Sequence, residues 1–297
     1  MTTLTNAGLK GYNTLHFEWF LVDWCNFKCS YCNAADRMSE KYSKQTSPSK
    51  YKLVLERLRR LDMDFEIDIF GGEPTLHPEF LSILEQLSSM PNCKLIEIKT
   101  NLSKSLTFFQ EVVKFDKVRL AASFHAEYYD LVFLTKCVAL KDSNFYCHIN
   151  LSDKPNDWPM MLRTIDNFDR HSVKYDLNVL LSTPDYTVNY SDEFYNLFEK
   201  HLAKQSDKSL YRLGFDNGTE EWMPVFLIHK NKLGNFNGFN CQALLYEITA
   251  EGDFINSCTR QPLPLFIKEE DVMKNSVCPK TVCHADMMLN FYKERNV

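Results

Sequence analysis

The sequence lacks a long apolar run, a secretory signal and an excess of basic residues. No stretch of about 18 apolar residues occurs, so no membrane-spanning helix is expected. The first residues, MTTLTNAGLKGYN, contain no apolar core of the kind that a secretory signal needs. The net charge of −5 provides no basic surface for a nucleic acid. We therefore expect a cytoplasmic protein whose partners include neither a membrane nor a nucleic acid.

Cysteine, in contrast, is abundant, with ten residues in a chain of 297. In a reducing compartment, clustered thiols bind metal more often than they form disulfides. The length fits one domain of about 200 residues with a smaller appendage. We found no internal repeat and no low-complexity segment that would indicate another organisation.

Apolar runs and amphipathic stretches alternate along the first two thirds of the chain. Ser191 is well placed to cap the last of the expected helices. Strands are expected at 16–23, 65–70, 94–100, 117–124, 145–151 and 173–182, and helices at 51–61, 77–90, 106–115, 128–140, 158–168 and 191–204.

Six strand–helix units predict an α/β fold with a parallel sheet and helices outside it. Six units fall short of the eight that close a barrel, so we predict a partial (β/α)6 TIM-like barrel over residues 16–205. An N-terminal extension, residues 1–15, precedes it. In residues 206–297 the alternation of strand and helix patterns stops. This region is expected to form a small cysteine-containing α+β appendage, with a hairpin at 241–258. Ligands of parallel sheets lie at the C-terminal ends of the strands.

Three cysteines crowd into the segment CNFKCSYC, directly after the first barrel strand. Cys25, Cys29 and Cys32 have the spacing C-x3-C-x2-C, and no cysteine or histidine close by in sequence completes a set of four. Three thiolates on one loop can bind three corners of a cubane iron–sulfur cluster and leave one iron open. A closed zinc site with a distant fourth ligand is the structural alternative.

The second barrel strand ends in GGEP. Gly71 and Gly72 allow close backbone approach, Glu73 can place a negative charge beside an ammonium group, and Pro74 ends the strand. An ordinary strand-to-helix turn would also use these residue types.

Together, these two motifs closely resemble those of the radical S-adenosylmethionine (SAM) superfamily. The resemblance covers roughly the first 205 residues. It implies a [4Fe-4S] cluster on Cys25, Cys29 and Cys32 whose fourth iron binds SAM, and it assigns GGEP to the SAM amino group. Reductive cleavage of SAM would then give a 5′-deoxyadenosyl radical that abstracts hydrogen from a substrate, with an electron donor such as flavodoxin or ferredoxin.

Other polar residues at strand ends match positions that contact SAM or substrate in this superfamily. Tyr31 precedes the last loop cysteine, where an aromatic residue usually lies beside adenine. Ordinary strand-end hydrogen bonding is the alternative for the remaining candidates, which are Thr100, Asn101, Ser123, His125 and Asn150.

The predicted appendage contains four further cysteines: Cys241, Cys258, Cys278 and Cys283. The region resembles the twitch appendage, a shortened relative of the SPASM domain, which would imply one auxiliary [4Fe-4S] cluster. The last pair is spaced x4 rather than the tighter x2 that is often seen. A four-cysteine zinc site, free thiols, and replacement of one ligand by His284 are the alternatives. Cys93, Cys137 and Cys147 are expected to be buried, inert thiols.

Fold and motifs do not identify the substrate. We expect a small-molecule or peptide substrate. The first barrel strand begins near residue 16, which we interpret as leaving no room for a leader-binding domain, and this favours a small molecule or a peptide delivered by another protein. A ribosomal-peptide-modifying maturase with one auxiliary cluster, and a non-catalytic iron–sulfur or zinc-binding module, are the two alternatives.

Overall fold

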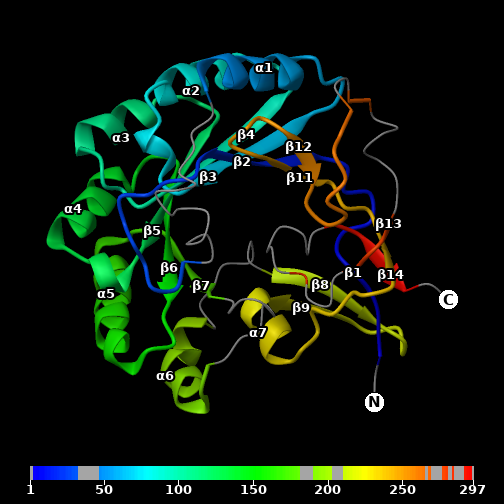
Figure 1. Cartoon of the computed structure of the whole chain (residues 1–297). Helices are drawn as coiled ribbons and strands as arrows, with labels where there is room; N and C mark the ends of the chain where they lie inside the picture. The colour runs from blue at the N-terminus through cyan, green and yellow to red at the C-terminus, as the bar shows by residue number, and fades with distance from the viewer. Residues whose placement is uncertain are drawn as a thin grey trace.

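The computed structural model shows two β-sheets, one of which is surrounded by helices. It describes residues 3–32, 47–180, 190–202, 210–264, 267–268, 276–279, 283 and 291–295. The larger sheet has eight strands in the order β12-β11-β2-β3-β4-β5-β6-β7, and the smaller has six in the order β13-β10-β14-β1-β8-β9. Figure 1 shows the helices arranged in an arc around the larger sheet.

Six parallel strands of the larger sheet follow one another in chain order, and each pairs with the next. They lie where the apolar runs predicted strands. Their bounds are β2 (Leu15–Val22), β3 (Phe65–Gly71), β4 (Cys93–Thr100), β5 (Val118–Phe124), β6 (Phe145–Leu151) and β7 (Tyr175–Val179). The partial barrel of six strand–helix units is therefore confirmed.

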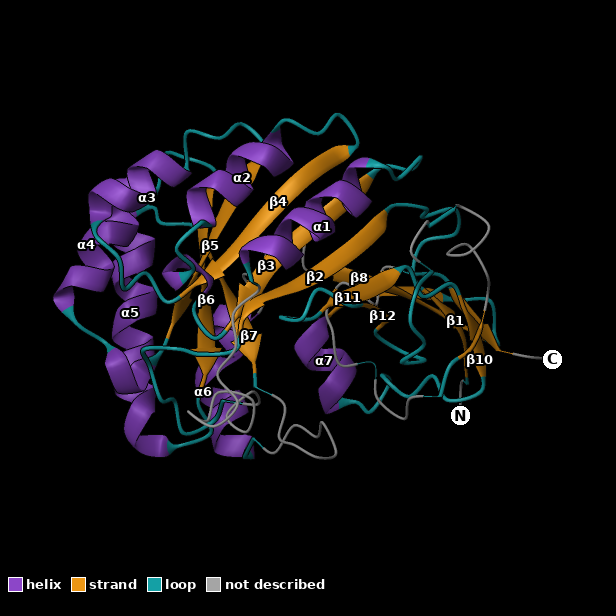
Figure 2. Cartoon of the chain, turned by 45° about the horizontal axis from the view of Figure 1, so that its top comes forward, coloured by secondary structure: helices purple, strands orange, loops and turns teal. Residues whose placement is uncertain are grey.

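Helices connect these strands and cover one face of the sheet (Figure 2). Short 3-10 turns at Pro74–Leu76, Ala126–Tyr128 and Pro155–Asp157 precede three of them, so α2 and α4 begin three residues later than the sequence pattern predicted. Ser191 accepts a hydrogen bond from Phe194 N at 3.2 Å, as expected for a cap. The helices are α1 (Pro48–Arg59), α2 (Phe80–Ser88), α3 (Leu106–Val112), α4 (Leu131–Leu140), α5 (Trp158–His171) and α6 (Asp192–Leu202).

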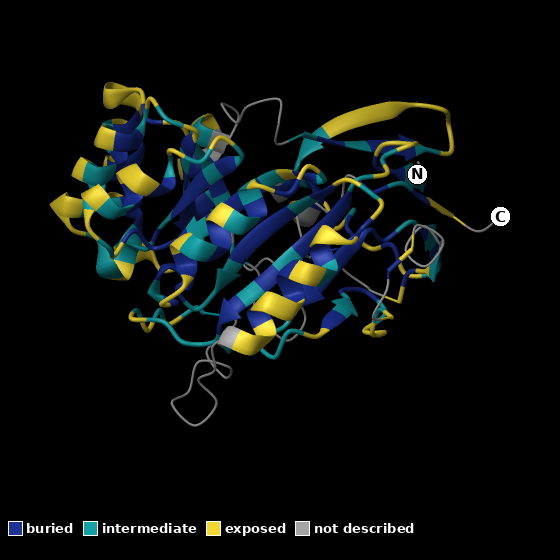
Figure 3. Ribbon diagram, turned by 90° about the horizontal axis from the view of Figure 1, so that it is seen from above, coloured by how far each residue is buried: buried dark blue, intermediate teal, exposed yellow. Residues whose placement is uncertain are grey.

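The two faces of the larger sheet differ in chemistry because successive side chains of a strand point to opposite sides. The outer face packs under the helices, as the buried strands and inner helix faces in Figure 3 illustrate. Its fully buried side chains include Phe17, Trp19, Ile67, Ile69, Ile96, Ile98, Leu120 and Ile149. The inner face alternates with these and carries His16, Glu18, Glu66, Asp68, Glu97, Lys99, Arg119, His148 and Asp176.

The remaining elements lie beyond the six strand–helix units. They are β1 (Leu4–Ala7), β8 (Leu210–Phe215), β9 (Glu220–Pro224), α7 (Val225–Lys230), β10 (Phe239–Cys241), β11 (Leu245–Ile248), β12 (Phe254–Asn256), β13 (Ser276–Val277) and β14 (Lys293–Arg295). The predicted hairpin corresponds to β11 and β12, and Gly252 in its turn has φ +84°.

Three long-range pairings were not visible in the local sequence pattern. Residues 1–15 contain β1, which pairs with β8 and β14 and so belongs to the smaller sheet. β11 pairs in parallel with β2 and extends the barrel sheet. The domain boundaries at residues 15 and 205 remain predictions, but both ends of the chain contribute strands to the smaller sheet.

Candidate functional site

The cysteine loop, residues 25–32, follows β2 and is fixed against the segment after β5. Lys28 N donates a hydrogen bond to the hydroxyl of Tyr128 at 2.6 Å. The rings of Phe27 and Tyr128 stack with their centroids 4.2 Å apart and an interplanar angle of 6°. This stack orients the loop at the C-terminal edge of the sheet.

A charged tether also fixes the loop. Ser30 N donates to Glu127 Oε2 at 2.9 Å, and the Ser30 hydroxyl also donates to this carboxylate. Lys154 Nζ lies 2.6 Å from Ser30 Oγ and 2.9 Å from Glu127 Oε1. Burial opposes ionisation of Glu127, but the hydrogen bonds from Ser30 and Lys154 and the charge of Lys154 together lower its pKa to about 2. The tether is therefore ionised at neutral pH.

His125 joins the loop to the ends of β6 and β7. Its Nδ1 lies 2.8 Å from the Tyr31 hydroxyl, 3.4 Å from Cys29 Sγ and 3.5 Å from Asn150 Nδ2. Burial lowers the pKa of His125 to about 4, so the ring is neutral and Nδ1 can accept a hydrogen bond from the nearest of these groups, the Tyr31 hydroxyl. Asn178 Nδ2 donates to Asn150 Oδ1 at 2.7 Å and continues the chain of contacts onto β7.

Asn101, at the end of β4, holds the start of the loop. Its Nδ2 donates to Asn26 Oδ1 at 2.9 Å and lies 3.6 Å from Cys25 Sγ. The residue is 6% exposed. The side chain of Asn101 therefore positions the first cysteine directly.

The Glu73 carboxylate is buried and accepts hydrogen bonds from the protein at both oxygens. Oε1 accepts hydrogen bonds from Thr75 N at 3.2 Å, from the Thr75 hydroxyl at 2.5 Å and from the Thr100 hydroxyl at 2.7 Å. Oε2 accepts from Asn101 N at 2.7 Å. Burial raises the pKa of Glu73, and these hydrogen bonds oppose the rise. Glu73 thus caps the turn after β3 and joins it to β4.

Gly71 and Gly72 allow β3 to approach the backbone that leads into the cysteine loop. A Cβ at Gly71 would lie 2.0 Å from Val22 O, and one at Gly72 would lie 2.0 Å from Trp24 O. Gly72 N donates to Val22 O at 2.8 Å, and Glu73 N donates to Trp24 O at 3.0 Å. We expected these glycines to let a ligand approach the backbone. Their closest neighbours here are the backbone atoms of Val22 and Trp24, which lead into the loop.

The three loop thiols interact electrostatically with one another. Burial, together with the nearby Cys32 and Cys25, raises the pKa of Cys29 to about 12. Burial also raises the pKa of Cys25, with Glu73 and Cys32 adding to the effect. The thiols therefore stay protonated unless positive charge is supplied, and metal binding would release their protons.

This donor set fits an iron–sulfur cluster. Three thiols on one fixed loop match a cubane, which takes each thiolate on a different iron. Within the described ranges, no three His, Cys, Asp or Glu side chains converge on a position for a single metal ion. Cys25, Cys29 and Cys32 would hold the cluster. Asn101 and His125 contact the loop directly, and Thr100 and Asn150 lie behind them through Glu73 and His125. Ser123 lies deeper on the inner face, in register with His148.

The four cysteines of the predicted appendage come from separate segments and lie near enough to one another to interact electrostatically. Their exposed fractions are 3% for Cys241, 8% for Cys258 and 5% each for Cys278 and Cys283. Cys278 N donates to Phe239 O at 2.8 Å, beside Cys241 on β10. Burial, together with the nearby Cys283, Cys241 and Cys278, raises the pKa of Cys258 to about 12. His284 lies outside the described residues.

The thiols that were expected to be inert are indeed buried. Cys93, Cys137 and Cys147 are each 0% exposed and belong to the core.

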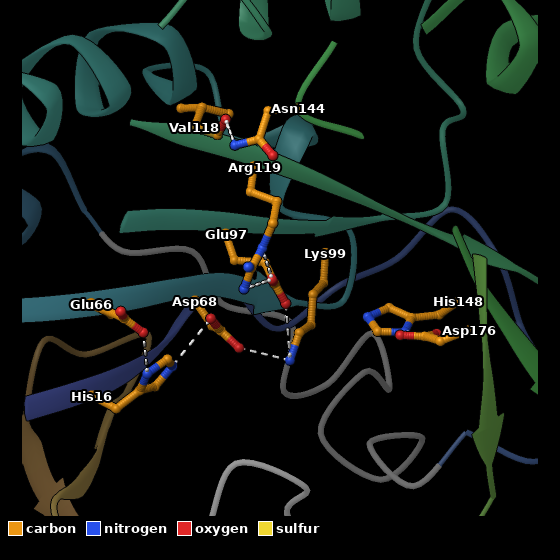
Figure 4. Close-up of polar contacts among 10 residues, drawn as sticks. All are labelled: His16, Glu66, Asp68, Glu97, Lys99, Val118, Arg119, Asn144, His148 and Asp176. Carbon is orange, nitrogen blue, oxygen red and sulfur yellow. Dashed lines mark hydrogen bonds and ion pairs between the residues drawn. The ribbon is translucent and has the colours of Figure 1, made fainter. Parts of the chain in front are cut away.

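The inner face of the sheet carries a chain of ion pairs, drawn in Figure 4. Lys99 Nζ lies 2.7 Å from Asp68 Oδ2, and His16 Nε2 lies 3.1 Å from Asp68 Oδ1. Arg119 Nη2 lies 2.5 Å from Glu97 Oε2. The side chains of Lys99 and Arg119 are 33% and 40% exposed. A barrel interior filled by Val, Ile and Leu would be dry, whereas this face is charged and partly open.

A histidine–aspartate pair lies between this network and the cysteine loop. His148 Nδ1 lies 2.5 Å from Asp176 Oδ1, and both point to the inner face. The same register pairs Asn150 with Asn178 two residues further along β6 and β7. Two residues along a strand correspond to about 7 Å, so the pair lies one pleat below the His125 contacts.

Sequence reasoning missed several residues that position the loop. Phe27, Glu127, Tyr128 and Lys154 were not singled out, although Glu127 and Tyr128 follow directly after SFH at the end of β5. Their position beyond a strand end was the available signal.

The structure combines a partial barrel with a three-cysteine loop after the first parallel strand. Comparison with known protein families finds a match over this part of the chain. Residues 19–135 match the family model of the radical SAM superfamily. This segment contains the cysteine loop, GGEP, Thr100-Asn101 and His125. Over residues 19–135 the chain is therefore similar to the radical SAM superfamily.

Curated relatives match only over part of their length. GTP 3′,8-cyclase of Pasteurella multocida is 36% identical over 100 residues, which is 33% of this chain and 28% of the relative. GTP 3′,8-cyclase of Shewanella denitrificans is 33% identical over 81 residues, 27% of this chain and 24% of the relative. The chain thus spans about a quarter of the length of the relatives it matches.

Solved structures share the fold over most of the chain. Histidine-tagged anSMEcpe with bound AdoMet has a TM-score of 0.58 at 13% identity. The superposition covers 89% of this chain and 81% of the anSMEcpe chain. SuiB of Streptococcus suis bound to S-adenosylmethionine has a TM-score of 0.55 at 14% identity, with 85% and 63% covered. Native anSMEcpe with bound AdoMet and Cp18Cys peptide has a TM-score of 0.55 at 14% identity, with 82% and 73% covered. At these identities the likeness shows the fold.

Among the described residues, no helix is both long enough and apolar enough to span a membrane.

Proposed function

We propose that this protein is a radical SAM enzyme that cleaves S-adenosylmethionine reductively and abstracts hydrogen from a substrate. The observation that carries the proposal is the loop with Cys25, Cys29 and Cys32, which side chains from β4 and from the segments after β5 and β6 hold at the C-terminal edge of a partial barrel. The chemistry that a [4Fe-4S] cluster supplies at such a site is one-electron reduction of the SAM sulfonium, which gives methionine and a 5′-deoxyadenosyl radical.

The residues around the loop position the cofactor. Asn101 holds Cys25, and neutral His125 holds Cys29 and Tyr31 at the edge of the sheet. We propose that Tyr31 lies beside the adenine, as an aromatic residue before the last cysteine does in this superfamily. We also propose that GGEP faces the SAM amino group. Since protein donors occupy the Glu73 carboxylate, its charge would act on that ammonium through space.

The polar inner face of the sheet supports a substrate with polar groups. His148, Asp176, Lys99 and Arg119 are partly exposed there and offer both acids and bases. A small polar molecule would pair with these groups directly, and a peptide would need to place one side chain there. One solved neighbour is described with a bound peptide. We favour a small polar molecule, with a peptide-modifying maturase as the alternative.

The four buried cysteines of the predicted appendage support one auxiliary iron–sulfur cluster. Four thiolates complete a cubane with no open iron, and a four-cysteine zinc site has the same ligands. The electron for SAM cleavage would come from a small redox protein such as flavodoxin or ferredoxin.

Anaerobic reconstitution tests the proposal. The wild-type protein should bind iron and sulfide and convert SAM to 5′-deoxyadenosine when dithionite is added, as measured by mass spectrometry. Cys29→Ala should lose this activity, whereas Cys93→Ala, which removes a buried thiol at the opposite end of the sheet, should retain it. A reconstituted wild-type protein that binds metal but never forms 5′-deoxyadenosine would instead support the non-catalytic module.

A further inference from the structure

A buried lysine lies beside the four cysteines of the predicted appendage. Lys293 is the first residue of β14 and is 1% exposed. Its Nζ donates to Phe291 O at 2.9 Å and lies 5.2 Å from the centroid of the Phe236 ring. Fully buried lysines are rare because burying the charge is costly, so a buried lysine indicates a place where negative charge is present.

Strand pairing places this lysine on the cysteine side of the smaller sheet. β14 and β10 are antiparallel, and Lys293 is directly opposite Cys241. Directly opposed residues of antiparallel strands share a face, with Cβ atoms roughly 5 Å apart. Phe236, under the Lys293 head group, is two residues from Gly234, whose carbonyl accepts a hydrogen bond from Cys283 N at 2.8 Å. The head group is thus bordered by segments that carry two of the four cysteines.

We propose that Lys293 is a built-in positive charge of this four-cysteine site and raises the reduction potential of the iron–sulfur cluster held there. The inference rests on the proposed auxiliary cluster. A cubane with four thiolates is anionic and gains one more negative charge on reduction, so a fixed cation nearby stabilises the reduced form. Low solvent exposure strengthens the effect because little water screens the charge.

The electrostatics of the thiols agree with this geometry. Burial raises the pKa of Cys241 and of Cys258, and Lys293 opposes the rise at both. One cation therefore favours the thiolate form at cysteines from two separate segments. A raised potential suits electron acceptance rather than substrate anchoring. In that reaction class, the substrate radical would pass one electron to the cluster and one proton to water.

A redox titration of the full chain tests the proposal. Cys25→Ala, Cys29→Ala and Cys32→Ala are combined so that only the tail cluster remains. Its midpoint potential is followed by electron paramagnetic resonance under a controlled potential. In this background, Lys293→Met should shift the midpoint to more negative potential. Lys293→Arg should retain most of the wild-type value, and Arg295→Met should leave it unchanged, because Arg295 is exposed on the same strand and lies opposite Phe239.

The outcomes separate two failures. A triple-cysteine background that binds no iron, or binds zinc instead, overturns the auxiliary cluster and this proposal with it. A cluster with full iron content and the same potential in Lys293→Met overturns the role of Lys293 alone. If Lys293→Met loses the cluster, Lys293→Gln serves as the second neutral variant. Loss of the cluster from both neutral variants, with retention in Lys293→Arg, supports the proposal because assembly then requires the charge.

Discussion

Substitution of Gly72 by alanine should displace the cysteine loop. The added Cβ would lie 2.0 Å from Trp24 O and 2.8 Å from Cys25 N, where ordinary contacts need at least 3.4 Å. The two backbones must therefore separate by about 1 Å or more, which breaks the bonds from Gly72 N to Val22 O and from Glu73 N to Trp24 O. Two lost hydrogen bonds and the strain together amount to about 3 kcal/mol.

Iron content after reconstitution and urea unfolding of the metal-free protein measure this effect. We expect Gly72→Ala to lose the loop cluster and about 3 kcal/mol of unfolding free energy. Gly218→Ala is the matched control: Gly218 has φ +81°, but a Cβ added there would meet no atom within 4 Å, so the substitution should cost about 1 kcal/mol and retain the cluster. Wild-type iron content in Gly72→Ala, with unchanged unfolding, would refute the close-approach reasoning.

Three further predictions concern the metal sites and the ion-pair network. Cys29→Ala should abolish formation of 5′-deoxyadenosine while the metal of the tail remains, and elemental analysis of tail metal would expose a general folding defect. The double variant Cys241→Ala/Cys258→Ala should lose the iron of one cluster. Loss of zinc with an unchanged iron content would contradict an auxiliary cluster. Burial opposes protonation of His16, but Asp68 raises its pKa to about 9, so its stabilising effect is complete below pH 6.5 and is lost as pH rises through 9. Unfolding free energy should therefore fall over this range by up to about 3 kcal/mol more in wild type than in His16→Gln, and parallel pH profiles would rule this out.

The local pattern of apolar residues was sufficient to predict the six barrel strands, but not the pairing of β1 and β11. In the strands β2 to β7, apolar residues recur at every second position between turns, and burial on the helix side requires apolar residues at these positions. β1 and β11 are each four residues long, and their partners lie far away in sequence, at β8, β14 and β2. Strand pairing of this kind depends on tertiary register, which periodicity does not encode.

The candidate site was predictable in its residue types but not in its contacts. The spacing of Cys25, Cys29 and Cys32 identified the loop, and strand-end position identified Asn101 and His125. Which groups bind one another depends on the register of neighbouring strands. Consequently, the sequence could not show that the Glu73 carboxylate accepts hydrogen bonds from Thr75, Thr100 and Asn101. The roles of these residues toward SAM remain predictions.

The parallel pairing of β11 with β2 fixes the spacing between the two cysteine clusters. Cys25 follows the C-terminal end of β2, whereas Cys258 follows β12, whose last residue Asn256 is opposite Tyr246 and, through it, Phe17 near the start of β2. The two clusters thus lie toward opposite ends of one hydrogen-bonded strand. A hydrogen-bonded sheet resists stretching, so the distance between the two groups of cysteines is fixed by the length of β2. A molecule that reaches from one group toward the other must match that distance.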